Sequence, residues 1–465
     1  MIRTFIGPHF LCVAGLLLFL TPSYIHAQDT LRVSLQDFLN QGIEASSLLD
    51  AEQQNVDLAE NQYARARGAR ILPEIGLTTA HGLVPGVVTN RPEEFSRGEL
   101  YLDPYLENDW EDWGIFTQGE ISAIQPIFTW GAINNAINAA QAGADASHHE
   151  FDVERSDYEL QLFELYYGRI LAIEMERLVD EASEQLSQAE ELMQEMLEDN
   201  DPNLNEADVY QFNIFRYEFA SQAEEVRQNV NFVEEAWRLA LKVNEQTMLY
   251  PQEPYLDPLV NDIQEIDYYM GQAMNNRPDL KGLDAAVRAA DYGVEATRSQ
   301  FRPGLFLGLN GRFAHTPNRP RQTNPFIRNN TNYSSGSFGV GIRQNLNISG
   351  MRKEAQRSEA QLRQVKYYKE AAVDGISLEL NEQYSNVKTA EARVNNTRGA
   401  LNVSNEWLRQ EQLDFDLGFG DVENLVDAVR SNLELEVTFR QHIHDYNVSL
   451  ARLFNMAGLP LRELN

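Results

Sequence analysis

The stretch QPIFTWG at residues 125–131 returns as QNLNISG at residues 344–350, with glutamine and glycine at the same spacing. Upstream of each copy, a helical segment with alanine and arginine leads to a proline and an apolar strand, at residues 66–78 and 296–308. The order helix, strand, loop, strand, long helix, turn, long helix therefore occurs twice. Because this period is too long for a solenoid repeat, the sequence predicts a duplicated domain.

These landmarks divide the chain into three parts. Residues 1–27 are interpreted as a signal peptide, because Arg3 precedes a short apolar run and Ala27 offers a cleavage position. An uncleaved membrane anchor is the alternative for this segment. The first repeat covers residues 28–262, with strands near 74–82 and 115–128 and a helical hairpin at 131–245. The second covers residues 263–465, with strands near 304–313 and 336–348 and a helical hairpin at 350–457.

Each repeat contains a very long helical stretch. From about Ala132 to Glu198 there is no proline and there are only two glycines, which corresponds to roughly 100 Å of helix. Apolar side chains recur there at helical spacing, for example at Tyr166, Ile170 and Ile173. Such length indicates coiled coils or helical hairpins rather than a globular core.

The predicted strands alternate between apolar and polar residues. The alternation is clearest in Leu305–Phe313 and Phe338–Ile348, and strands of about ten residues with this pattern suit a membrane barrel. A single strand at the edge of a soluble sandwich would alternate in the same way. Four strands cannot close a barrel, since the smallest have about eight, and an open edge in lipid leaves backbone groups unpaired. The strands therefore have to be completed by other chains, and three copies would supply twelve.

Charge and cysteine content exclude several classes of protein. The 465 residues contain 70 acidic and 38 basic side chains, for a formal net charge of −32. This balance argues against binding to nucleic acid, which needs clustered cations. The single cysteine, Cys12, excludes a disulfide framework and a cysteine-ligated zinc site.

No catalytic or metal-binding constellation is recognised in the sequence. His148-His149 and His442-x-His444 are one or two positions apart, so on a helix they do not face the same way. An outer-membrane hydrolase would need a nucleophile–base pair, and no such pattern occurs. We therefore expect a protein that is not an enzyme and has no cofactor or metal.

Taken together, the mature chain resembles the TolC-like outer-membrane efflux proteins (outer-membrane factors). The resemblance is carried by the segments at residues 66–73 and 277–303, by the two glutamine–glycine stretches, and by the second hairpin tip at residues 418–428. It implies a mainly α fold with a β-barrel contribution: four membrane strands per chain, a homotrimer with a 12-stranded β-barrel in outer-membrane lipid, and a long periplasmic α-helical barrel.

The resemblance also implies a function and partners. The chain would be the passive channel of a tripartite efflux or type I secretion system in the cell outer membrane. It would work with a periplasmic adaptor (membrane fusion protein) and an inner-membrane pump of the RND or ABC type. The alternative, from a different class, is an acidic periplasmic coiled-coil scaffold without a pore.

Candidate site residues follow from the resemblance and lie at three places. Adaptor docking is expected at the two hairpin tips, which contain Pro202, Asn203, Gly418, Phe419 and Gly420. The first tip departs from the family, because Pro202 stands about where glycine is usual. The pore constriction is assigned to Asp427, with Asn424 and Asp421 beside it; alternatively, Asp427 faces solvent outside the tunnel.

The third candidate place is the outer mouth. The loop at residues 82–114 is rich in acids, whereas the loop at residues 314–335 carries arginines and no acid. We expect these loops to lie together at the extracellular end and partly to neutralise one another. The charges concerned are Glu93, Glu94, Asp109, Asp112, Arg319, Arg321 and Arg328.

Overall fold

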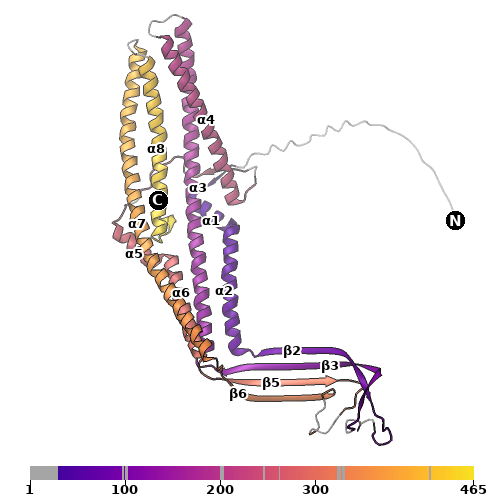
Figure 1. The fold of residues 1–465 in the computed structure, drawn as a ribbon. Helices are drawn as coiled ribbons and strands as arrows, with labels where there is room; N and C mark the ends of the chain where they lie inside the picture. Colours follow the sequence, from indigo (N-terminus) through magenta and orange to yellow (C-terminus); the bar gives the residue numbers. More distant parts are fainter. Residues whose placement is uncertain are drawn as a thin grey trace, which may run out of the picture.

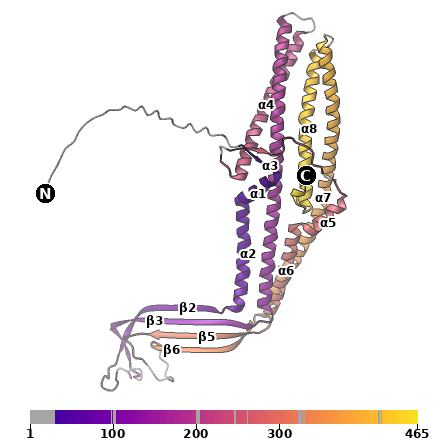
Figure 2. The ribbon, with the colours of Figure 1, turned by 180° about the vertical axis from the view of Figure 1, so that it is seen from behind.

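A computed structural model describes residues 30–96, 99, 103–198, 204–244, 247–260, 262–321, 326, 330–417, 420 and 422–464. The chain is elongated, with a four-stranded sheet at one end of the long helices and the two helical tips at the other (Figure 1). Seen from behind, the same two helical hairpins rise side by side from the region above the sheet (Figure 2). The interpreted signal peptide lies outside the described residues.

The first repeat contributes two of the four strands of the sheet and one helical hairpin. Its elements are β1 (Thr30–Val33), α1 (Leu35–Ala45), α2 (Ser47–Ile71), β2 (Glu74–Val88), β3 (Glu107–Phe128), α3 (Ala132–Glu198), α4 (Glu206–Leu241) and β4 (Met248–Pro251). Ser34 and Ser46 cap α1 and α2 through their side-chain oxygens. The short strands β1 and β4 pair in parallel and join the two ends of this repeat.

The second repeat follows the same order. Its elements are α5 (Ile266–Asn276), α6 (Pro278–Ser299), β5 (Gly304–His315), β6 (Tyr333–Arg343), α7 (Ile348–Asp416), α8 (Val422–Met456) and a short 3₁₀ turn (Leu461–Glu463). Pro278 occupies the first turn of α6, where its missing N–H costs nothing. Within the described part of the chain, no helix combines the length and the apolar character needed to cross a membrane.

The four long strands form one antiparallel sheet in the order β2-β3-β5-β6. The edges of this sheet are β2 and β6, one from each repeat. The predicted fold class, mainly helical with four long strands per chain, is confirmed.

The strand bounds differ from the predicted ones at two places. Strand β2 continues to Val88 and β3 begins at Glu107, because pairing resumes beyond a register shift at Pro85/Gly86. Proline and glycine there mark a bulge rather than the start of a loop. Strand β6 ends at Arg343, not near residue 348, because the Asn347 side chain caps α7 by accepting from the Gly350 N–H at 3.1 Å.

The largest apolar core lies midway along the helices. Trp237 of α4 stacks on Tyr166 of α3 at 5.2 Å between ring centroids and contacts Phe38 of α1 at 4.4 Å. The Tyr166 hydroxyl bonds to the Val33 carbonyl at 2.9 Å and to Glu253, and burial together with that carboxylate raises the pKa of Tyr166. This core therefore ties both helices of the first hairpin to the short β1–β4 pair.

Candidate functional site

One face of the four-stranded sheet is apolar and exposed. Ile75, Ala123, Leu309 and Phe338 are cross-strand neighbours in one row through all four strands. Ile75, Leu307, Leu309 and Phe338 on this face are 43–86% exposed, with Phe338 the most exposed. Alternation in a strand sends successive side chains to opposite faces, so the period-2 pattern seen in the sequence is realised as a continuous apolar surface.

The opposite face of the sheet is polar. Glu120 of β3 accepts a hydrogen bond from the Asn310 amide at 2.7 Å and pairs with the Arg312 guanidinium at 3.2 Å. Thr78 lies opposite Glu120 in β2, and Ser335 lies opposite Arg312 in β6. A sheet with these two faces fits between a hydrocarbon phase and an aqueous lumen.

The repeated glutamine–glycine stretches form the junction of sheet and helices. The Gln125 amide donates to the Arg70 carbonyl at 3.0 Å, and the Gln344 amide donates to the Phe301 carbonyl at 3.2 Å. Each glutamine thus binds a carbonyl at the end of the helical segment that precedes its partner strand. The glycines differ, since Gly131 has φ +92° whereas a Cβ at Gly350 would lie nearest to the capping Asn347 side chain, 2.6 Å from its amide nitrogen.

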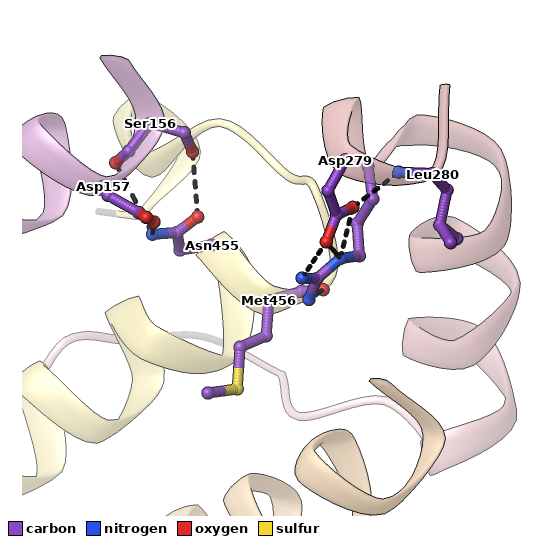
Figure 3. A network of polar contacts seen from close by, with 7 residues as sticks. Ser156, Asp157, Asp279, Leu280, Asn455 and Met456 are labelled. Carbon is purple, nitrogen blue, oxygen red and sulfur yellow. Dashed lines mark hydrogen bonds and ion pairs between the residues drawn. The ribbon is translucent and has the colours of Figure 1, made fainter. Parts of the chain in front are cut away.

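The Arg277-Pro278-Asp279-Leu280 motif forms a joint between α6 and the end of α8 (Figure 3). Arg277 binds the Asp279 carboxylate through two nitrogens, at 3.0 and 2.6 Å, and donates to the Met456 carbonyl at 3.0 Å. Asp279 accepts from the Leu280 N–H at 2.8 Å, and Asn455 bonds to Ser156 of α3 at 2.8 Å (Figure 3). The motif therefore fixes the start of α6 to the end of α8, and the neighbouring Asn455 joins that end to α3.

The acidic outer loop is organised around a carboxylate inside it. Asp103 has a fully buried side chain, accepts from Thr89, and pairs with Arg91 at 2.9 Å. The Thr89 hydroxyl and the Tyr105 backbone N–H lower the pKa of Asp103, and Arg91 adds to this effect. Arg91 also pairs with Glu94 at 2.9 Å. Two acids of this loop, Asp103 and Glu94, are thus neutralised by an arginine of the same loop.

The two loops lie in contact through hydrogen bonds to backbone carbonyls rather than through opposite charges. Arg319 donates to the Pro85 carbonyl at 3.0 Å, and Asn318 donates to the Asp112 carbonyl at 2.9 Å. Among the described residues, neither Arg319 nor Arg321 forms an ion pair with an acid of the first loop. Arg328 lies outside the described residues, Glu93 is exposed, and Asp109 is half-buried.

The helical tips are described in part, and Pro202, Asn203, Gly418, Phe419 and Asp421 lie outside the described residues. At the first tip, Asn205 begins α4 with a capping box in which Asp208 is the reciprocal partner. At the second, the Gly420 N–H donates to the Asp414 carbonyl at 2.8 Å. A Cβ at Gly420 would lie 2.5 Å from the Phe415 backbone nitrogen, so this turn requires glycine.

Two of the three assigned constriction residues, Asn424 and Asp427, lie three positions apart on α8 and therefore on a similar face. Asn424 and Asp427 are exposed, whereas Val426, Val429 and Leu433 pack against the apolar cluster of α3 and α4. Asp427 therefore points away from the first hairpin of its own chain. It forms no ion pair with a described cation.

Sequence reasoning missed the ion pairs that join the two hairpins. Helix α8 contains three arginines, and each pairs with a glutamate of the first hairpin. Arg430 pairs with Glu218 at 3.5 Å, Arg440 with the buried Glu174 at 3.1 Å, and Arg452 with Glu164 at 2.8 Å. The sequence does hint at these pairs, because the basic residues of α8 are all arginines and its other charged residues are mainly acids.

The histidines contact separate partners. His148 lies 3.0 Å from Glu60, His149 lies 3.4 Å from Asp152, and His442 lies 2.8 Å from the Thr397 hydroxyl. In the part of the chain that the structure describes, no group of three or more His, Cys, Asp or Glu side chains is arranged to hold a metal ion.

These features can be compared with those of known proteins. Residues 269–458 match the family model described as outer membrane efflux protein. The resemblance inferred from the sequence is thereby confirmed. That match covers the second repeat, and the likeness in fold extends over nearly the whole chain. No curated protein sequence matches the chain.

Three solved structures show the extent of this likeness. A membrane protein from Pseudomonas aeruginosa has a TM-score of 0.73 and 16% identity, over 91% of this chain and 93% of that one. The open state of the MtrE outer membrane channel of Neisseria gonorrhoeae has a TM-score of 0.72 and 14% identity, over 92% and 89%. The CmeC outer membrane channel of Campylobacter jejuni has a TM-score of 0.71 and 14% identity, over 91% and 85%. This chain shares their fold.

Proposed function

We propose that three copies of this chain form a passive duct through the outer membrane, the channel component of a tripartite efflux or type I secretion system. The sheet would contribute four of twelve barrel strands, and the helices would continue as a tunnel into the periplasm. Substrates would be handed over by an inner-membrane pump, of the RND or ABC type, through a periplasmic adaptor. The chain itself would perform no catalysis.

The observation that carries this proposal is the sheet with two open edges and one exposed apolar face. The edges β2 and β6 present unpaired backbone groups, which are costly in lipid unless another strand pairs with them. Edge-to-edge pairing of identical chains satisfies both edges only when the ring closes. Four strands per chain and three chains give a closed ring of a size that membrane barrels adopt.

Disulfide cross-linking between the two edges tests the assembly. The chain after residue 27 contains no cysteine, so Thr78→Cys can be combined with Ser335→Cys or Ser337→Cys on the same face of the sheet. We expect a trimer on a non-reducing gel for one of the two registers, and none for Thr78→Cys alone. A stable monomer with intact strand content and no cross-linked trimer would contradict the proposal.

Adaptor contact is proposed at the helical tips. The close turn at Gly420 presents a short loop between two long helices, and such a loop can be approached end-on by a helical partner. Glycine is favoured at this helix end because it readily adopts φ > 0. We expect Gly418→Val to change the shape of the tip that the adaptor would meet, and so to weaken adaptor binding more than it lowers stability. Full efflux by an inserted, folded variant would exclude docking at Gly418.

A pore-free periplasmic scaffold is the competing function. It accounts for the helices, but it leaves the apolar sheet face without a covering surface. Fractionation separates the two functions, since a membrane-inserted barrel stays with the outer membrane during a urea wash. Release by urea would favour the scaffold.

A further inference from the structure

Trp130 and Arg302 form an exposed pair at the helix-side rim of the apolar sheet face. The Arg302 guanidinium lies 5.2 Å from the centroid of the Trp130 ring, and Trp130 is 44% exposed. Phe128, the cross-strand neighbour of Leu305, contacts Trp130 edge-on at 4.9 Å. The pair therefore continues the apolar face where the strands meet the helices.

The position of Trp130 is fixed by its backbone and its polar atoms. Trp130 has φ +54°, which is uncommon for a bulky residue and costs energy. Its indole N–H donates to the Pro303 carbonyl at 2.9 Å, and the Ser299 hydroxyl lies 3.1 Å from its carbonyl oxygen. The ring is thus held in one outward orientation, with its only donor already bonded.

The charge of Arg302 has no described acidic partner, although the chain is strongly acidic. Arg298, one turn earlier, pairs with both Glu295 and Glu359, at 2.9 and 2.8 Å. Arg302 is exposed and pairs with none of the described carboxylates. Its guanidinium is therefore free to bind an anion from outside the chain, and guanidinium binds phosphate through paired hydrogen bonds.

We propose that Trp130 and Arg302 bind the phosphate headgroup of a phospholipid at the periplasmic rim of the sheet. The inference rests on the proposed function, since it requires the sheet to cross the outer membrane. An indole beside a cation at the end of an apolar band is the arrangement that interfacial headgroups favour. Strand β3, which leads into Trp130, lies inside the sheet, so pairing of edges between copies does not cover it.

The site occurs once per chain because the positions equivalent to Trp130 and Arg302 in the other repeat carry different residues. Trp130 comes from the first glutamine–glycine stretch, and its counterpart in the second is Ser349. Arg302 precedes Pro303, and the residue that precedes Pro73 is Leu72. Ser349 and Leu72 therefore provide neither an indole nor a cation.

Native mass spectrometry of the trimer with phosphatidylglycerol tests the site, with diacylglycerol and inorganic phosphate as separate probes. We expect Arg302→Gln to lower phosphatidylglycerol retention about tenfold, the loss of roughly one charge-assisted hydrogen bond. Arg302→Lys should restore part of it, and Arg298→Gln, whose arginine is already paired with acids, should leave it unchanged. Equal retention by Arg302→Gln and the parent, or displacement of the lipid by millimolar phosphate, would overturn the proposal.

Quenching by lipids with brominated chains separates failure of this site from failure of the proposed function. Trp113 lies in β3 near its other end and is 51% exposed. We expect both Trp113→Phe and Trp130→Phe to reduce the quenched fraction of the fluorescence. A reduction with Trp113→Phe alone would overturn the headgroup site while leaving the duct intact. No quenching in any variant would show that the sheet is not in lipid.

Discussion

In the first repeat the chain leaves the sheet through Trp130 and Gly131, both with positive φ, whereas in the second it leaves through Asn347, whose side chain caps α7. Both exits turn a strand into a helix of 67 or 69 residues. The first uses a strained backbone and an exposed ring; the second uses an ordinary side-chain cap. The same path of the chain is therefore reached by different local means, and only the first exit leaves an aromatic side chain at the rim.

The outer loops of the two repeats differ in the same way. The first is held by the ionised Asp103, with Arg91 and Thr89 around it. The second is held by the buried amide of Asn332, which accepts from the Thr316 N–H at 2.8 Å and donates to the Thr316 carbonyl at 3.0 Å. A charged centre and a neutral centre thus close equivalent loops, and they should respond differently to acid.

The largest expected effect concerns the ion pairs that join the repeats. Arg440→Met leaves the Glu174 carboxylate, whose side chain is 4% exposed, with Arg177 alone. We expect a loss of about 2–3 kcal/mol in the free energy of unfolding, near the lower end for breaking a buried pair, because Arg177 remains. Arg452→Met breaks the more exposed pair with Glu164 and should cost about 0–1 kcal/mol.

Denaturant unfolding in detergent, followed by circular dichroism, measures this difference. Equal denaturant midpoints for the two variants would show that breaking the buried pair at Glu174 costs no more stability than breaking the exposed pair at Glu164. The result shows whether the one buried ion pair, rather than the two more exposed pairs, sets how firmly the hairpins are joined.

The second prediction compares the glycines of the two exits. Gly131→Ala places a Cβ on a residue with φ +92° and should cost about 1–2 kcal/mol. Gly350→Ala places its Cβ 2.6 Å from the Asn347 amide nitrogen, which can move away, so the cost is that of a lost helix cap, about 1 kcal/mol. The same unfolding experiment applies, and a larger loss for Gly350→Ala would reverse the assignment of strain to the first exit.

How far the sequence predicts this structure is visible at the same exits. The Gln125 and Gln344 stretches correctly mark where strands give way to helices, because each amide is needed to bind a helix-end carbonyl. Asn345 and Asn347 continue the strand alternation by chance, so the end of β6 was predicted too late. The first loop is predicted to begin at residue 82, whereas a bulge at Pro85/Gly86 lets the strand pairing continue to Val88.

The candidate site was less predictable, because charge alone does not identify a partner. With 70 acids in the chain, the pairing of Arg430, Arg440 and Arg452 with three particular glutamates depends on how the hairpins pack. The pairing of Asp103 with Arg91 within one loop likewise depends on a turn that brings residues twelve apart together. Composition indicates a charged surface, and only the fold assigns the contacts.

A third prediction uses pH to separate the two outer loops. The pKa of Asp103 is lowered in the folded state, so its contribution is complete above the ordinary aspartate value, near 4, and is lost as pH falls through the lowered pKa. Acid should therefore loosen residues 89–106 but leave residues 316–332 held by Asn332. Hydrogen exchange, corrected for the intrinsic effect of pH, measures both segments in one sample. Faster exchange of both segments at the same pH would contradict the prediction that only the first loop depends on an ionised carboxylate.

The smallest effect on stability is expected for Asp427, and its readout is conduction. Asp427 is exposed and pairs with no described cation, so Asp427→Asn should leave unfolding unchanged. If the exposed face of α8 lines the tunnel, three copies place three like charges around one axis, which attracts cations and hinders anions. The variant should then lower cation selectivity and weaken block by multivalent cations added on the periplasmic side. Glu225→Gln, the same change of charge on exposed α4, is the control. Unchanged selectivity in an intact Asp427→Asn trimer would place Asp427 on the outer surface of the tunnel, where the second hairpin would present its acids to solvent as the first does.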